Sequence, residues 1–97
     1  MIKHKSWGFV DSFAHTPFYQ GRVVFIRKDE IYGPIHTDLN HVDVYISEGC
    51  AFVNKNGKEF YLPWYHHTSF IPGDEYQITA CGTDVLLFEV STGKSNE

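Results

Sequence analysis

Hydrophobic and polar residues alternate over short runs along much of the chain, and turn-forming residues separate these runs. In one run Val42, Val44 and Ile46 alternate with more polar residues, which is the period of a β-strand with one buried face. No window of about eleven residues keeps the spacing of an amphipathic helix. The pattern predicts an all-β protein with strands over residues 7–13, 22–27, 42–47, 51–55, 58–62, 68–71, 76–80 and 84–91.

Short turns that contain glycine separate the predicted strands. Asn56-Gly57 lies between two of them, and this dipeptide is the strongest short signal for a β-hairpin. Pro72-Gly73-Asp74 and Cys81-Gly82 mark two further turns. Several short strands with this spacing predict a sandwich or a barrel.

The composition is that of a folded globule. The chain has 97 residues, of which 42% are hydrophobic and 16% aromatic, so residues 1–97 are expected to form one domain with one core. The polar residues 92–97 are expected to fray.

The charge and the cysteines narrow the range of partners and compartments. Eight Lys and Arg against twelve Asp and Glu give a net charge of −4, which argues against binding to nucleic acid or to an anionic membrane. No apolar run is long enough to span a bilayer, and the first residues do not resemble a signal peptide, so a cytoplasmic location is expected. Cys50 and Cys81 lack a C-x-x-C spacing and are expected to be reduced thiols.

The order of motifs from Gly33 to Val90 resembles that of the cupin superfamily. The matching stretches are residues 35–49, 52–62, 70–78 and 84–90. The first ends on Gly49, as the first cupin motif does, and the third contains Pro72-Gly73 of the second motif. The resemblance implies a double-stranded β-helix, a jelly-roll barrel, with residues 33–90 as its motif-bearing part.

The resemblance also implies a metal site, but the ligand positions have changed. Cupin enzymes usually hold a divalent metal with two His and one Glu of the first motif and one His of the second. Counted back from Gly49, these positions carry His36, Asp38 and Val42, and the second-motif His falls on or beside Tyr76. A tightly bound metal wants three or four well-placed ligands, so we expect no metal cofactor and keep a divalent metal as the less favoured alternative.

The candidate site residues follow from this register. His36, Asp38 and Tyr76 are the predicted catalytic residues, with Asp38 orienting the imidazole of His36 and Tyr76 presenting a hydroxyl from the opposite sheet. The predicted ligand-binding residues are His36, Tyr76, Trp64 and His67. The competing structural interpretation makes His36 and Asp38 turn residues and places Trp64 at the end of the barrel.

Three functions are compatible with the sequence. The first is a small cupin-like protein that binds a polar molecule of sugar or carboxylate type in the barrel mouth, either as a binding protein or as a metal-independent isomerase, epimerase or lyase. The second is a non-catalytic binding or assembly module that has lost the metal site. The third is a different small barrel that binds nucleic acid through exposed aromatics, which the acidic balance disfavours.

The aromatic residues predict a homodimer. Tyr45 and Phe52 fall on the strand face opposite the expected core, and Trp7, Phe9 and Phe13 lie in an aromatic N-terminal arm. A monomer of this size rarely exposes so much apolar surface, and a two-fold interface is the commonest way to cover it.

Overall fold

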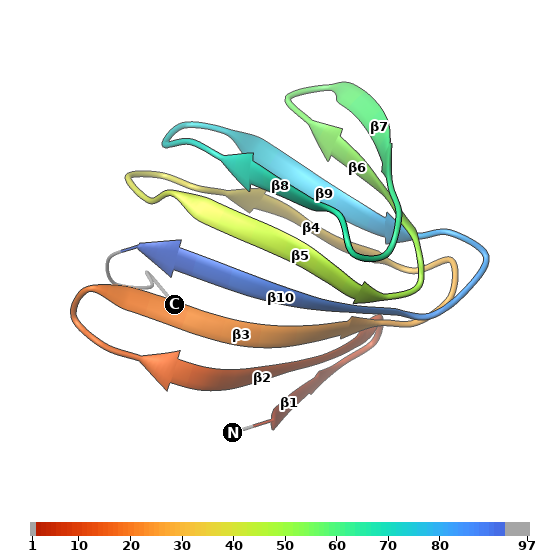
Figure 1. The fold of residues 1–97 in the computed structure, drawn as a ribbon, viewed down its shortest axis with the longest axis horizontal. Helices are drawn as coiled ribbons and strands as arrows, with labels where there is room; N and C mark the ends of the chain where they lie inside the picture. Colours follow the sequence, from red (N-terminus) through yellow and green to blue (C-terminus); the bar gives the residue numbers. More distant parts are fainter. Residues whose placement is uncertain (1, 93–97) are drawn as a thin grey trace.

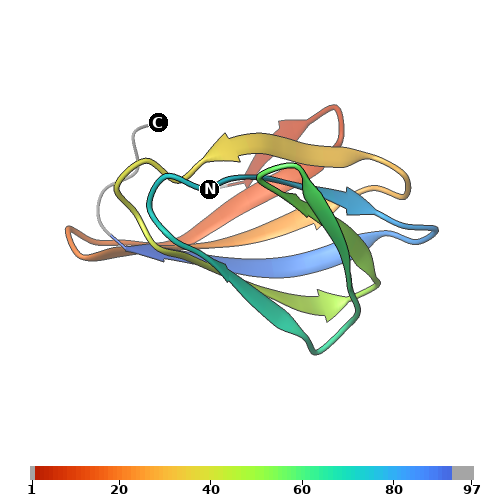
Figure 2. The ribbon, with the colours of Figure 1, turned by 90° about the horizontal axis from the view of Figure 1, so that it is seen from above.

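A computed structural model describes residues 2–92, which form ten antiparallel strands in two sheets (Figures 1 and 2). The strands are β1 (Ile2–Lys5), β2 (Gly8–His15), β3 (Tyr19–Ile26), β4 (Ile31–His36), β5 (Val42–Glu48), β6 (Ala51–Lys55), β7 (Lys58–Leu62), β8 (His67–Phe70), β9 (Glu75–Ala80) and β10 (Val85–Thr92). One sheet has the order β1-β2-β3-β10-β5-β8 and the other the order β4-β9-β6-β7. None of the residues described forms a helix that could cross a membrane.

This architecture confirms the predicted all-β, jelly-roll class. Each of the eight predicted strands has a counterpart, but β1 and β4 were missed. The sequence of β1 is Ile-Lys-His-Lys, which lacks a second apolar residue, and all four residues are exposed. The pattern of β4 is interrupted by Gly33-Pro34, a pair that normally marks a turn. Of the expected frayed tail 92–97, Thr92 ends β10 and the remainder lies outside the residues described.

The core lies between the two sheets, and the predicted alternation of β5 is confirmed. Val42, Val44 and Ile46 are at most 5% exposed. The opposing sheet contributes Val53 and Ile78, both fully buried. At about 25 cal/mol per Å² of apolar area, burial of such side chains is the main source of stability in a small sandwich.

A bulge in β4 decides which of its side chains face the core. Tyr32 is the partner of Ile78 in β9, and Ile35 is the partner of Tyr76, so β4 has one residue more than β9 between the two pairs. Gly33 adopts a φ of +115° there, and a Cβ on it would lie 2.9 Å from the carbonyl oxygen of Tyr76. The extra residue turns both Tyr32 and Ile35 inward.

The outer face of the six-stranded sheet is unusually apolar. The rings of Phe9 and Phe25 stack with centroids 5.1 Å apart, and those of Phe13 and Phe88 meet edge to face at 6.4 Å. Tyr45 lies opposite Phe88 in the register and is 39% exposed. Tyr45, Phe9 and Phe13 therefore share one surface, as expected.

The other two aromatics of the predicted dimer surface lie elsewhere. Trp7 packs beside the core with its ring centroid 5.0 Å from that of Tyr32. Phe52 belongs to β6 in the other sheet and contacts Tyr61. Sequence proximity to the apolar arm was therefore misleading for Trp7, which lies in the turn between β1 and β2 and packs toward the core.

We propose that two copies of the chain associate through this outer face of the six-stranded sheet. Light scattering should then give a dimer mass at micromolar concentration. Phe88→Glu should give a monomer, because it places two charges in the centre of a two-fold interface. The control is Ile31→Glu, which changes an exposed hydrophobic residue of the other sheet and should leave the dimer intact. A monomer mass for the unmodified chain would contradict the proposal.

Candidate functional site

The inward-facing row changes from apolar to polar along two neighbouring strands. In β3 it runs from Ile26 and Val24 to Arg22 and Gln20, and in β10 it runs from Val85 and Leu87 to Glu89 and Ser91. Arg22 and Glu89 are direct cross-strand partners in the antiparallel register. The interior of the sandwich therefore has a packed apolar part and a polar end, where β3 begins and β10 ends.

A buried network of charge and hydroxyl groups fills this polar end. Glu89 is 3% exposed, and the Arg22 guanidinium donates to its Oε1 through Nε at 3.0 Å and through Nη2. The hydroxyls of Tyr32 and Tyr76 each donate to Oε2 at 2.9 Å. Arg22 Nη2 also donates to the Tyr32 hydroxyl at 2.9 Å. The carboxylate is thus paired in charge and hydrogen-bonded on both oxygens, as a buried carboxylate must be.

The two tyrosines of this network are fixed as proton donors. Burial raises the pKa of Tyr76 well above its usual value, and the negative charge of Glu89 raises it further. The pKa of Tyr32 is raised for the same two reasons, in the same order. Neither phenol ionises near neutral pH, so neither can act as a general base there.

A cavity of about 230 Å³ opens beside the network at the barrel mouth. It is lined by Gln20, Arg22, Ile35, His36, Thr37, Asp38, Asn40, Val42, Tyr76, Glu89 and Ser91. The volume lies below the ~300 Å³ at which pockets for drug-sized ligands begin. The mouth therefore suits a molecule of about monosaccharide size.

The structure places His36 and Asp38 at the rim of this cavity. The register pairs His36 with Glu75, and its imidazole Nε2 lies 2.9 Å from Glu75 Oε2 on the outer side of the sheet. The side chain of His36 is 66% exposed. Asp38 lies in the loop between β4 and β5 with a φ of +53°, and its carbonyl accepts a hydrogen bond from the Gly73 amide at 3.0 Å.

Tyr76 points into the interior, but not from the side that was predicted. It lies on β9, which is hydrogen-bonded to β4, so it shares a sheet with His36 rather than facing it from the opposite sheet. The prediction was wrong because β4 was not recognised as a strand. Tyr76 stacks on Phe70 of the other sheet, with ring centroids 3.9 Å apart, and this contact joins the two sheets.

Trp64 and His67 do not line the cavity. Trp64 lies between β7 and β8, is 55% exposed and meets Tyr65 edge to face at 6.5 Å. His67 begins β8 and pairs with Tyr45. Phe70 is the buried residue of β8. Because side chains alternate between the two faces of a strand, His67, three residues earlier, lies on the outer face.

Sequence reasoning missed Arg22, Glu89, Tyr32 and Gln20. The signal for the first two was present, because each continues an inward-facing apolar row: Glu89 follows Leu87, and Arg22 precedes Val24. Opposite charges at core positions of two strands that pair in the middle of a sheet predict a buried ion pair. Gln20 continues the row of Arg22.

The metal that the family resemblance implies does not fit these residues. Within residues 2–92 no three His, Cys, Asp or Glu side chains are placed to share a metal ion. The carboxylate of the network, Glu89, already forms an ion pair with the guanidinium of Arg22. A divalent cation beside that guanidinium would be repelled.

The comparisons with known proteins agree on the fold. No family model and no curated protein matches the chain. An RmlC-like cupin from Shewanella frigidimarina is similar with a TM-score of 0.87 and 15% identity, over 99% of this chain and 86% of that one. KdgF from Halomonas sp. is similar with a TM-score of 0.83 and 16% identity, over 91% of this chain and 80% of that one. The Cnp3 cupin domain of Schizosaccharomyces pombe is similar with a TM-score of 0.82 and 18% identity, over 89% of this chain and 64% of that one.

This chain therefore has the cupin fold, as the motif order indicated. Identities of 15 to 18% show the architecture and not the reaction, because one fold hosts many functions.

Removal of the Arg22 charge should strongly destabilise the fold. Arg22→Met leaves the Glu89 carboxylate buried without a counter-charge, at a cost of about 3–5 kcal/mol. Glu89→Gln keeps an acceptor for the tyrosine hydroxyls. The double variant should therefore lose less than the sum of the two single variants, by about 0.5–3 kcal/mol. Urea unfolding of the four proteins measures this difference, and strict additivity would contradict the pairing.

The raised tyrosine pKa values predict a loss of stability in alkali. In the unfolded chain Tyr32 and Tyr76 ionise near pH 10, whereas in the folded chain their pKa values are higher. The folded state therefore holds more protons above about pH 10, and its free energy of unfolding should fall as the pH rises from there. Urea midpoints at pH 8, 10 and 11 test this. In Tyr76→Phe the fall should be shallower, and an equal slope would contradict the assignment.

Proposed function

We propose that the barrel mouth binds a small, uncharged polyhydroxyl molecule of the sugar type. The observation that carries the proposal is the cavity of about 230 Å³, whose wall combines hydrogen-bond donors and acceptors from both sheets. Such a wall matches hydroxyl groups, each of which donates one bond and accepts others. The cupin fold supports a ligand at this place, because ligands bind in the mouths of β-barrels.

The charges around the mouth favour a sugar over a carboxylate. Arg22 is offset by Glu89, so the network contributes no net charge. A carboxylate ligand would meet the Glu89 carboxylate, and Arg22, the arginine of the cavity wall, is already paired with that group. An uncharged molecule would meet no such repulsion.

Two side chains at the open end have the geometry for bidentate contact with vicinal hydroxyls. Gln20 and Ser91 are cross-strand partners in β3 and β10, and both line the cavity. Directly opposite residues in an antiparallel pair have Cβ atoms about 4.5–5.5 Å apart. An amide and a hydroxyl at that spacing can bond neighbouring oxygens of one sugar ring.

Proton transfer on such a ligand would rest on His36. The interior offers no free base, because Glu89 is saturated with donors and both tyrosines stay protonated. The imidazole of His36 is exposed at the rim and is oriented through Nε2 by Glu75, which leaves Nδ1 for a substrate. An isomerase, epimerase or lyase would use it as acid and base, and a pure binding module would not need it.

Titration with neutral monosaccharides and with small carboxylates, followed by NMR of the labelled protein, tests the site. A neutral sugar should shift the side-chain amide signal of Gln20, and Ser91→Leu should weaken binding at least tenfold by filling the mouth. The matched control is Val90→Leu, one residue earlier on the outer face of β10, which should bind normally. Binding of carboxylates alone, or equal binding by both variants, would contradict the proposal.

The catalytic part of the proposal has its own variant. His36→Ala should retain sugar binding within a few-fold, since His36 lies at the rim. If the bound sugar is converted, the variant should lose roughly 10²- to 10⁴-fold in rate. Conversion that survives His36→Ala would show that the mouth is not the catalytic site.

A further inference from the structure

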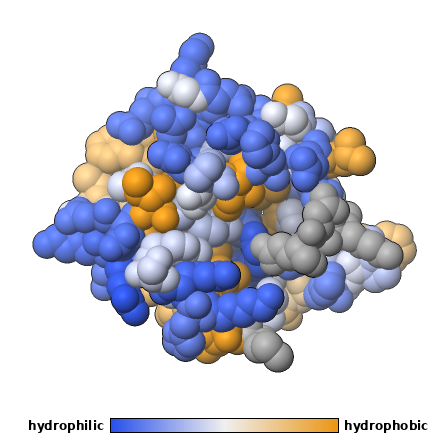
Figure 3. Space-filling model, turned by 180° about the vertical axis from the view of Figure 1, so that it is seen from behind, coloured by the Kyte–Doolittle hydropathy of each residue, from blue (hydrophilic) through white to orange (hydrophobic). Residues whose placement is uncertain are grey.

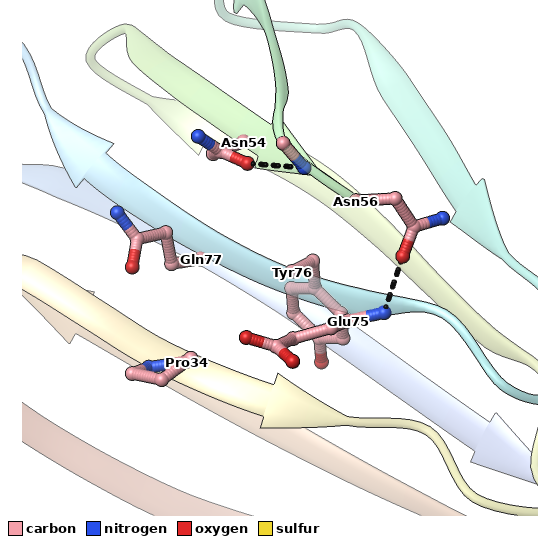
Figure 4. A pocket seen from close by; sticks show the side chains of 7 residues that line it. Pro34, Asn54, Asn56, Glu75, Tyr76 and Gln77 are labelled. Atoms are coloured by element: carbon pink, nitrogen blue, oxygen red, sulfur yellow. Dashed lines mark hydrogen bonds between the residues drawn. The ribbon is translucent and has the colours of Figure 1, made fainter.

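A second hollow lies on the outer face of the four-stranded sheet. Its volume is about 380 Å³, which exceeds that of the barrel mouth. It is lined by Pro34, Asn54, Asn56, Gly57, Glu75, Tyr76 and Gln77. Figure 4 shows the side chains of Asn54, Gln77 and Glu75 rising from two neighbouring strands toward this hollow. The proposed function of the mouth makes no use of Asn54 or Gln77, and it uses Glu75 only to orient His36.

The strand register arranges this face in parallel rows. Asn54 of β6 lies opposite Gln77 of β9, so two amides stand side by side. Two residues further along β6, Phe52 lies opposite Tyr61 of β7. Two residues of a strand span roughly 7 Å. A row of amides therefore runs beside a row of aromatic rings.

The floor of the hollow is held rigidly by bonds within the chain. Asn54 Oδ1 accepts the Gly57 amide at 3.0 Å, which closes the hairpin. Asn56 Oδ1 accepts the Glu75 amide at 2.9 Å, and its Nδ2 donates to Asp74 Oδ1 at 2.8 Å. The hydrogen bond from the Asn56 side-chain amide lowers the pKa of Asp74 and so favours the charged form of its carboxyl group. Binding at this surface would cost little further ordering.

Polar atoms that point into the hollow are left over for a ligand. In the part of the chain described, neither the Asn54 Nδ2 group nor the Gln77 side-chain amide has a hydrogen-bond partner. Glu75 contributes a carboxylate whose Oε2 is 2.9 Å from the His36 imidazole. These groups supply donors and acceptors without a cationic centre.

The adjacent aromatic row supplies an apolar platform. The rings of Phe52 and Tyr61 have centroids 5.5 Å apart at an angle of 54°, and Tyr61 is 52% exposed. An exposed ring buries the C–H face of a flat ligand at low cost in conformational entropy, because a tyrosine has only two side-chain torsions.

We propose that this outer face is a second binding site, for a neutral oligosaccharide that lies across the amide row and packs on the aromatic row. The carboxylates of Glu75 and Glu59 border the face, so acidic sugars and nucleic acids would be repelled. The side of the molecule opposite to the view of Figure 1 is largely hydrophilic, with apolar patches that are separate (Figure 3). A hydrated ligand fits that surface better than an apolar protein partner does.

The experiment uses the full chain and two probes, a neutral hexasaccharide of glucose and a hexasaccharide of galacturonic acid. NMR titration should show shifts of the Asn54 and Gln77 side-chain amides with the neutral probe. Gln77→Ala and Tyr61→Ala should each weaken binding at least tenfold. Val90→Ala is the control, on the outer face of the other sheet, and should bind within twofold of the unmodified chain.

Each outcome bears on one of the two sites. Binding of the neutral hexasaccharide that Ser91→Leu leaves unchanged supports the outer site, whatever becomes of the mouth. Binding that Ser91→Leu abolishes and Gln77→Ala leaves intact overturns it, as does equal binding of the acidic probe or the absence of amide shifts at millimolar sugar. Urea unfolding of each variant confirms that it is folded. Asn54→Asp keeps the acceptor for Gly57 and removes the free donor. Weakened binding of the neutral hexasaccharide by this variant is therefore an independent second test.

Discussion

The buried carboxylate of Glu89 is the constraint on which the open end of this sandwich depends. A carboxylate inside a protein must be paired in charge and fully hydrogen-bonded, or it costs several kcal/mol. Here Arg22 supplies the charge from the same sheet, and Tyr32 and Tyr76 supply hydroxyls from the other. The group that is most expensive to bury therefore joins the two sheets at the place where the apolar core ends.

The same network explains how a small fold can keep a cavity. A chain of 97 residues has few side chains for its core, and aliphatic residues would collapse around an empty space. A network of rigid, directional bonds keeps Arg22 and the tyrosines in fixed positions, and space remains beside them. The cost is that the interior groups are fully occupied with one another. Chemistry on a ligand then falls to groups at the rim, such as His36.

Much of the fold followed from the sequence, because alternation and turn residues are local signals. The row Val42, Val44 and Ile46 and the hairpin at Asn56-Gly57 are examples. The site was less accessible. Trp64 and His67 lie at positions that the pattern did not orient. The buried pair of Arg22 and Glu89 was readable as a charge at a core position of each strand, but only with the knowledge that the two strands are neighbours.

The bulge in β4 has a consequence for how sites in such walls can change over evolutionary time. If β4 kept regular alternation from Tyr32 along the same residues, without the bulge, residues 34 and 36 would face inward and the His36 imidazole would enter the barrel. With the bulge, Ile35 takes the inward position and His36 joins Glu75 outside. The bulge thus decides which of two neighbouring side chains, an aliphatic group or an imidazole, lies inside the wall. A substitution near Gly33 that straightens the strand could therefore exchange the two, with His36 itself unchanged.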